Sequence, residues 1–286
     1  MANQWNIGDV KISRIIESEA PWDGTFILPN ATAERMRQEA DWLFPIFSDE
    51  TGKLRMSIHA LIIESKGKKI IVDTCIGNDK IRSNPEWNKL QLPFLNDLQK
   101  IGYKRESIDH VICTHLHIDH VGWNTMLKDG KWVPTFDNAR YIIGGTEWDF
   151  FSKATDPFMK DPVDDSVRPV IDRGMADLVE STHKITDEVW LEPTPGHTPG
   201  HHAVRISSKG QNAVITGDLM HHPIQCAYPE WDDNFDSDGA MAKKTRRAFC
   251  ERYADKDVVV FGTHFATPSC GKIISKGDAF RFVAVK

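Results

Sequence analysis

The chain has 286 residues, a formal net charge of -6 and a hydrophobic content of 40%. This length and apolar content suffice to bury one large core, so we expect a single domain over residues 1–286. The negative charge disfavours nucleic acid as a partner, and the absence of any run of roughly 18 apolar residues or of a secretory signal predicts a cytoplasmic protein without a membrane partner.

The first third of the chain predicts strands separated by one long interruption. Apolar patterning indicates strands at residues 10–16, 60–64 and 69–73. A helix is expected at 93–102, where Gly102 ends it. Residues 18–56 break the strand rhythm and carry Pro, Asp and large aromatic side chains. We therefore expect 18–56 to form an N-terminal arm that covers a functional edge or pairs subunits in a homodimer.

Residues 115–120 read His-Leu-His-Ile-Asp-His and directly follow a predicted strand. If the backbone stays extended there, His115, His117 and Asp119 project to the same side, because side chains on an extended chain alternate with a period of two. His120 breaks this alternation, so a bend near Asp119 would direct Asp119 and His120 toward a second point nearby. The segment therefore predicts ligands for two metal ions.

Three more candidate ligands follow apolar runs further along the chain. Strands are predicted at residues 109–114, 139–143, 189–191, 202–206, 213–216, 258–261 and 272–274. His197 follows one of these runs in a Pro- and Gly-rich loop, and Asp218 and His264 each follow another. Strands that end at the same edge of a sheet bring their loops together, so we expect these side chains to join the motif at 115–120.

Two other segments complete the prediction. Residues 147–181 interrupt the strands again and are expected to form an insertion that acts as a lid or a dimer element. A helix is expected from about Lys243 to Tyr253, and its basic residues at 243–247 are interpreted as a solvated face.

The combination of these motifs resembles the metallo-β-lactamase superfamily of metallohydrolases. The resemblance extends from about Ile58 to the C-terminus and rests on Thr-His-x-His-x-Asp-His at 114–120, Pro-Gly-His at 195–197, Gly-Asp at 217–218 and Gly-Thr-His at 262–264. It implies an α/β fold in which two sheets pack face to face between helices, an αββα sandwich with a dinuclear metal site at one edge.

The resemblance also implies a set of ligands. They are His115, His117 and His197 for one metal, Asp119, His120 and His264 for the other, and Asp218 as the bridge. Asp73 would support the metal loop from behind, although its position at the end of a strand is equally typical of a turn residue. Two divalent cations are expected, and zinc suits these donors, while manganese, cobalt or iron accept the same set.

Asp218 and the residues around it indicate which branch of the superfamily the sequence resembles. Asp218 argues against a β-lactamase, because zinc β-lactamases carry a cysteine or no bridging carboxylate there. We expect a metal-bridging hydroxide as nucleophile, Asp119 as the residue that passes a proton to the leaving group, and His221 as a donor to the attacked oxygen. His221 stands where acyl-homoserine lactonases usually carry a tyrosine. The long interval between His120 and His197 is more similar to the lactonase or methyl parathion hydrolase-like branch.

Aromatic side chains indicate the substrate. Trp123 and Phe265 lie three positions and one position from candidate ligands and are expected to form a hydrophobic pocket wall. The predicted activity is therefore a metal-dependent hydrolase, a lactonase or esterase acting on a small substrate with an apolar tail. A phosphotriester hydrolase is the alternative within the same chemistry. Two alternatives have a different chemistry. They are a di-iron redox protein, which would need an electron-delivering module, and a non-catalytic metal-binding protein.

Overall fold

The computed structural model describes residues 4–285. Two seven-stranded sheets form its centre. In spatial order, the first sheet consists of β1 (Gln4–Ile7), β2 (Val10–Trp22), β3 (Leu54–Ser65), β4 (Lys68–Val72), β5 (His110–Cys113), β8 (Arg140–Gly144) and β9 (Ala176–Val179). The second consists of β10 (Lys184–Thr186), β11 (Val189–Pro193), β12 (His202–Ser208), β13 (Gln211–Ile215), β14 (Val258–Phe261), β15 (Cys270–Lys276) and β16 (Ala279–Ala284). A separate hairpin pairs β6 (Thr125–Lys128) with β7 (Lys131–Pro134).

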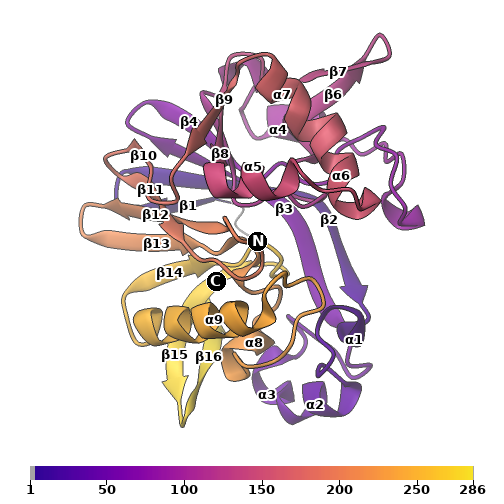
Figure 1. The fold of residues 1–286 in the computed structure, drawn as a ribbon. Helices are drawn as coiled ribbons and strands as arrows, with labels where there is room; N and C mark the ends of the chain where they lie inside the picture. The colour runs from indigo at the N-terminus through magenta and orange to yellow at the C-terminus, as the bar shows by residue number, and fades with distance from the viewer. Residues whose placement is uncertain (1–3, 286) are drawn as a thin grey trace.

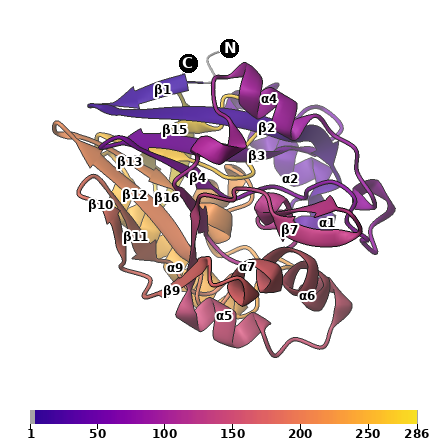
Figure 2. The same ribbon diagram turned by 90° about the horizontal axis from the view of Figure 1, so that it is seen from above.

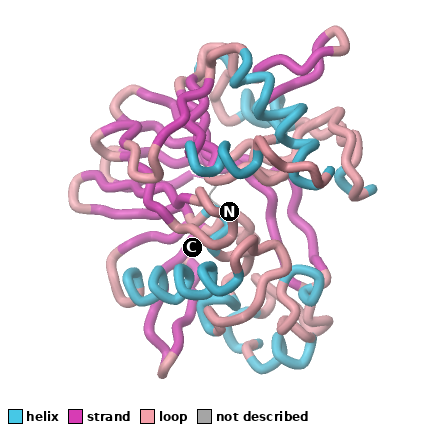
Figure 3. The backbone as a smooth tube through the Cα atoms, viewed as in Figure 1, coloured by secondary structure: helices cyan, strands magenta, loops and turns pink. Residues whose placement is uncertain are grey.

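The helices are mostly short. They are α1 (Gly24–Ile27), α2 (Ala33–Gln38), α3 (Ala40–Leu43), α4 (Phe94–Lys100), α5 (Gly145–Phe151), α6 (Pro157–Pro162), α7 (Arg168–Asp172), α8 (Ile224–Ala227) and α9 (Gly239–Tyr253). A π-helical turn, Val163–Val167, joins α6 to α7, and 3-10 turns lie at Pro85–Trp87, Arg105–Ser107, Gly122–Asn124 and Gly217–Leu219. Figure 3 shows the helices outside the strands.

Three hydrophobic clusters confirm the predicted αββα sandwich. The central cluster joins the inner faces of the two sheets, for example Ile63 of β3 and Val204 of β12. A second cluster packs Phe94 and Leu98 of α4 against the outer face of the first sheet. The third packs α8 and α9 against the outer face of the second sheet (Figure 1). Each sheet therefore has both faces buried, which explains the continuous apolar runs in the central strands.

The strand directions explain why the candidate ligands meet. β4, β5, β8 and β9 run parallel in the first sheet, and β13 and β14 run parallel in the second. β11 shares the direction of β13, because each pairs antiparallel with β12. The loops that follow β5, β11, β13 and β14 carry the candidate ligands, and they gather along one edge of the sandwich, as predicted.

The predicted bounds of the two interrupting segments were partly wrong. Residues 18–22 continue β2, and Trp22 pairs with Leu54 at the start of β3, so both ends of the segment 18–56 belong to the sheet. A β-bulge between Ile16 and Ser18 shifts the alternation of side chains, which hides the continuation of the strand from a period-two pattern. In 147–181, residues 176–179 form β9, an edge strand of the first sheet.

Helices from both segments lie at the same side of the molecule. Figures 1 and 2 show α1 and α6 on the side opposite the hairpins formed by β10 to β13. Phe26 of α1 and Phe158 of α6 each contribute to the wall of the same cavity, which is described below. Within residues 4–285, no helix combines the length and the apolar character that crossing a membrane would require.

Candidate metal centre

The loop after β5 does not follow the extended geometry from which the sequence prediction started. β5 ends at Cys113, and the chain turns immediately, with the N–H of His120 donating to the carbonyl of His117 at 3.1 Å. His115 and His117 therefore converge, but Asp119 points to a different group of side chains. The prediction that alternation brings Asp119 together with His115 and His117 was wrong, because the chain turns directly after Cys113. The prediction that a bend near Asp119 directs Asp119 and His120 toward a second point was confirmed.

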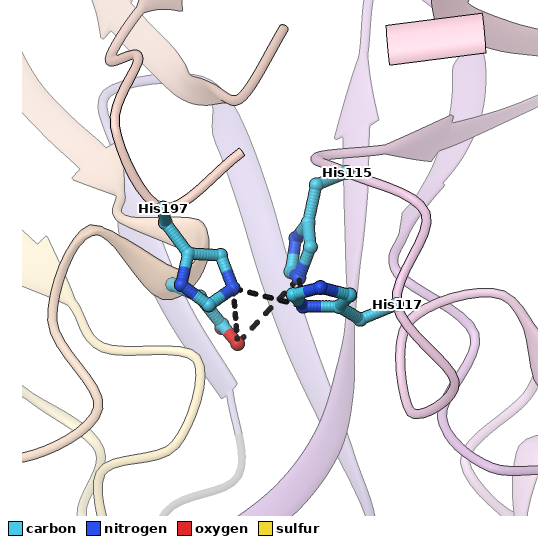
Figure 4. A group of neighbouring side chains, drawn as sticks. His115, His117 and His197 are labelled. Atoms are coloured by element: carbon cyan, nitrogen blue, oxygen red, sulfur yellow. Dashed lines mark hydrogen bonds and ion pairs between the residues drawn. The ribbon is translucent and has the colours of Figure 1, made fainter. Parts of the chain in front are cut away.

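His115, His117 and His197 form the first group, which we call the three-histidine cluster. His117 Nδ1 lies 3.1 Å from His115 Nε2 and 2.9 Å from His197 Nε2. Figure 4 shows the rings of His115 and His117 on one loop facing the ring of His197 on another. Asp218 Oδ2 approaches the same point and lies 3.6 Å from His115 Nε2 and 3.7 Å from His197 Nε2.

Asp119, His120 and His264 form the second group, which we call the mixed cluster. His264 Nε2 lies 3.3 Å from His120 Nε2 and 3.5 Å from Asp119 Oδ2. Asp218 also reaches this group, because its Oδ2 lies 3.1 Å from His120 Nε2 and its Oδ1 lies 3.2 Å from His264 Nε2. Asp218 thus stands between the two clusters, and the structure brings together all seven residues that the resemblance implied as ligands.

The donor atoms of these clusters fit metal cations. Burial lowers the pKa of His115 and His197 well below the usual range, so these imidazoles are neutral, which is the form that binds metals. Asp218 is 2% exposed, and its Oδ1 has no hydrogen-bond partner among residues 4–285. Burial acts to raise the pKa of Asp218, but the surrounding imidazoles lower it well below its usual range. Facing ring nitrogens beside a buried carboxylate oxygen that receives no hydrogen bond among the described residues are compatible with a dinuclear site.

Asp73 supports the metal loop. Its Oδ1 accepts the N–H of Thr114 at 2.8 Å, and its Oδ2 lies 2.9 Å from His120 Nδ1. Asp73 adopts a positive φ of 54° just after β4, which turns its side chain toward the next parallel strand. The residue is therefore both the turn residue and the support of His120 that the sequence left as alternatives.

Further supporting residues were missed in the sequence. Asp236 Oδ1 lies 3.1 Å from His197 Nδ1, and Asp236 Oδ2 pairs with Arg246 of α9. Arg246 is buried and donates to three backbone carbonyls, so the interpretation of the basic cluster as a solvated face was wrong for this residue. The third is His201, whose Nε2 accepts the N–H of Asp218 at 2.9 Å.

His221 lies beside Asp218, the residue that stands between the two clusters. Its Nε2 is 3.1 Å from Asp218 Oδ2, and its Nδ1 is 2.6 Å from Asp233 Oδ2. Burial lowers the pKa of His221, but Asp233 and Asp218 outweigh this effect and raise it well above the usual value. His221 also lines the cavity over the clusters, so one of its faces is accessible to a small molecule.

The cavity over the clusters has a volume of about 460 Å³ and mostly apolar walls. Its aromatic and aliphatic lining residues are Trp22, Phe26, Ile27, Met56, Ile58, Trp87, Ile118, Phe158 and Phe235. The expectation that Trp123 and Phe265 form this wall was wrong. Trp123 stacks on Phe94, and Phe265 is buried in the cluster beneath the second sheet. Proximity to the ligands in the sequence was a poor guide to the cavity wall, because nearby side chains along a turn point in different directions.

Comparison with known proteins decides the family. The sequence profile described as the Metallo-beta-lactamase superfamily matches residues 55–264. The chain belongs to the metallo-β-lactamase superfamily. An N-acyl homoserine lactonase of a Bacillus species is 24% identical over 174 residues, which cover 57% of this chain and 63% of that protein. A probable metallo-hydrolase of Mycobacterium tuberculosis is 25% identical over 185 residues, 57% of each chain. The chain thus spans less than two thirds of the curated relatives it matches.

Solved structures of similar proteins extend the likeness of the metallo-β-lactamase fold to the whole chain. AidC, a dizinc quorum-quenching lactonase solved with N-hexanoyl-L-homoserine as product, has a TM-score of 0.80 at 20% identity and covers 99% of this chain and 97% of its own. The hydrolase AbOPH has a TM-score of 0.79 at 23% identity with the same coverage. The arm and the insertion are therefore also part of the architecture that these proteins share.

Proposed function

We propose that this chain is a metal-dependent hydrolase of lactones or esters with apolar tails, and that it holds two divalent cations. The observation that carries the proposal is the position of Asp218 between the two clusters, with a carboxylate oxygen that lacks a hydrogen-bond partner among the described residues. His115, His117 and His197 would bind one cation, and Asp119, His120 and His264 the other. Zinc is the proposed metal, in line with the donors and with the dizinc relative.

The chemistry follows from the donor set and from the residues around it. When bound, two divalent cations supply a nucleophile for hydrolysis near neutral pH and polarise the attacked group. Asp119 lines the cavity, and its carboxylate would carry a proton to the leaving oxygen. His221 faces the same space, and its Nε2 would donate to the oxygen on which negative charge develops.

The cavity supports a substrate with an apolar tail. The tail would lie among Trp22, Phe26 and Trp87, and the reacting group would lie over Asp119 and Asp218. Burying such a tail contributes about 25 cal/mol per Å² of apolar surface. The lactonase names of several relatives favour a lactone over an acyclic ester. A phosphotriester with aryl groups would fit the same apolar walls and is retained as a competing substrate.

Metal removal tests the first part of the proposal. Dialysis against a chelator should abolish hydrolysis, and added zinc, manganese or cobalt should restore it. Elemental analysis of the same preparations gives the metal content. Full activity in a preparation shown to be free of metal would contradict the proposal.

A substrate panel tests the second part. The panel contains lactones of increasing tail length, an aryl ester, a thioester, a phosphotriester and a β-lactam, all assayed at known metal content. We expect kcat/KM to be highest for a long-tailed lactone and to be low for the β-lactam. The highest kcat/KM for the phosphotriester would instead indicate a phosphotriester hydrolase. An iron-bearing, coloured preparation that consumes oxygen with an electron donor would instead indicate a redox protein.

We also propose a cytoplasmic location and a homodimer. Phe26 of α1 and Phe158 of α6 are 58% and 37% exposed at the mouth of the cavity, where a second subunit would cover them. Light scattering of the purified chain measures its mass directly. A monomer at micromolar concentration would contradict the dimer and leave the hydrolase proposal unaffected.

A further inference from the structure

Glu147 contacts two of the loops that carry the three-histidine cluster. It is the third residue of α5, and its side chain is fully buried. Its Oε1 accepts the N–H of Leu116 at 3.2 Å, and Leu116 stands between His115 and His117. Its Oε2 accepts the N–H of Gly200 at 2.9 Å, in the loop that carries His197. One carboxylate therefore bridges the two backbone segments whose imidazoles converge.

The packing around Gly200 keeps α5 close to the loop of His197. A Cβ atom at Gly200 would lie 2.3 Å from the backbone nitrogen of Glu147, a distance that no side chain tolerates. Glycine at this position allows the start of α5 to press directly against the loop. The Glu147 side chain then reaches past Gly200 toward the loop after β5, so its length sets the separation of the two loops.

Burying this carboxylate is costly, which indicates that its two hydrogen bonds are needed. Burial raises the pKa of Glu147 to about 7. None of the salt bridges found within residues 4–285 involves Glu147, so no cation offsets the burial. A buried carboxylate without a cationic partner is unfavourable for stability alone, because an apolar residue of the same size would avoid the desolvation.

We propose that Glu147 is a positioning residue that fixes the geometry of the three-histidine site by holding the loops of His115, His117 and His197 at one separation. The hydrogen bonds of Glu147 found within residues 4–285 go to the loops of the three-histidine cluster. In the mixed cluster, Asp73 contacts His120 and the carbonyl of Ser57 contacts His264. Removing the Glu147 carboxylate should therefore weaken metal binding by the three-histidine cluster and leave metal binding by the mixed cluster unchanged. This inference rests on the proposed metal pair.

The substitution Glu147→Gln tests the role at constant side-chain size. An amide has one acceptor oxygen and one NH₂ group, so in either orientation one of the two N–H donors faces another donor and its loop is released. Zinc titration against a chromophoric chelator should show two sites, of which one binds about ten-fold or more weakly than in the wild type. The absorption of the cobalt-loaded protein should change with it, because the ligand geometry of one site has changed.

Glu188→Gln is the matched control. Glu188 is also buried, at 7% exposed, and its carboxylate accepts the hydroxyls of Ser65 and Ser208 beside β10 and β11, away from both clusters. This variant should bind both metals as the wild type does. Hydrogen exchange of the metal-free proteins adds a direct measurement, since the amide of Leu116 or of Gly200 should exchange faster in the Glu147→Gln variant alone.

Each outcome decides the inference. Unchanged zinc binding at both sites would overturn the role of Glu147. An equal loss of zinc affinity at both sites would also overturn it, because this result would indicate that the whole fold has been loosened. If Glu147→Gln does not fold, Glu147→Asp keeps the charge but shortens the side chain, so it cannot reach both loops and should produce the same selective loss. A wild-type protein that binds no metal would contradict the proposed function itself, which separates that failure from a failure of the positioning role.

Discussion

His221 Nδ1 lies 2.6 Å from Asp233 Oδ2, and this contact decides which side of the ring faces the cavity. A carboxylate bound to Nδ1 fixes the orientation of the ring, and the raised pKa of His221 keeps a proton on both ring nitrogens, so Nε2 can also donate. Nε2 is thereby directed at Asp218 and at the space where a substrate would lie. The pair has the arrangement expected of a polarised hydrogen-bond donor in a hydrolase.

Replacing His221 with alanine should lower kcat by about ten-fold or more with a smaller change in KM. The loss of a donor that acts on developing charge reduces transition-state stabilisation more than substrate binding. Steady-state kinetics on the best substrate of the panel measures the effect. Metal content is measured on the same samples, because His221 also lies near Asp218 and His264. Wild-type kinetics at full metal content would remove His221 from the catalytic residues.

Replacing Trp22 with alanine should reduce the preference for long tails. Trp22 lines the cavity and contacts Trp87 edge to face, with ring centroids 5.6 Å apart. Loss of this wall should lower kcat/KM about ten-fold for a long-tailed lactone and little for a short one. Trp42→Ala is the control, since Trp42 lies in the same segment but packs against the core rather than the cavity. Equal losses for all tail lengths would show that Trp22 has only a structural role.

Replacing Asp165 with alanine should destabilise the fold by about 3–5 kcal/mol, because two buried cations lose their partner. Asp165 binds Arg82 through both oxygens, at 2.6 Å and 3.0 Å, and lies 3.5 Å from Lys80 Nζ. The neighbouring Asp164 forms only exposed pairs, with Lys160 and Arg168, so Asp164→Ala should cost about 1 kcal/mol or less. Urea denaturation of the three proteins gives the comparison. Similar losses for the two variants would refute the assignment of Asp165 as the buried counterion.

Replacing Lys80 with methionine should change how stability depends on pH. Burial lowers the pKa of Lys80 from 10.5 to about 7, whereas the unfolded chain keeps the ordinary value. Between these values the unfolded state binds more protons than the folded state, so raising the pH stabilises the wild type. The free energy of unfolding of the wild type relative to Lys80→Met should therefore increase from pH 7 to about pH 10. A constant difference over this range would show that Lys80 keeps its proton in the folded protein, held by Asp165 and the ring of Trp132.

The strands and the candidate ligands could be predicted from sequence because both depend on local patterns. Residues 70–72 are apolar on both faces of the strand, and His264 follows Gly262 at the end of a similar run. Each position could therefore be assigned without knowledge of its neighbours in space. The short edge strands β1, β10 and β16 were not predicted. β1 and β10 are short and mostly half-buried or exposed, so their pattern does not differ from that of a loop. β16 was missed although its buried Phe280 and Phe282 alternate with half-buried or exposed residues.

The sequence by itself determined the fold class, the family and the residues that meet at the edge of the sandwich, since these follow from strand periodicity and from motifs a few residues long. Only the tertiary structure decided that Trp87 and Phe235 line the cavity, and that Glu147 bridges two loops. The physical reason is that these contacts join residues tens of positions apart. Their geometry is set by the packing of one sheet against the other, which no local spacing encodes.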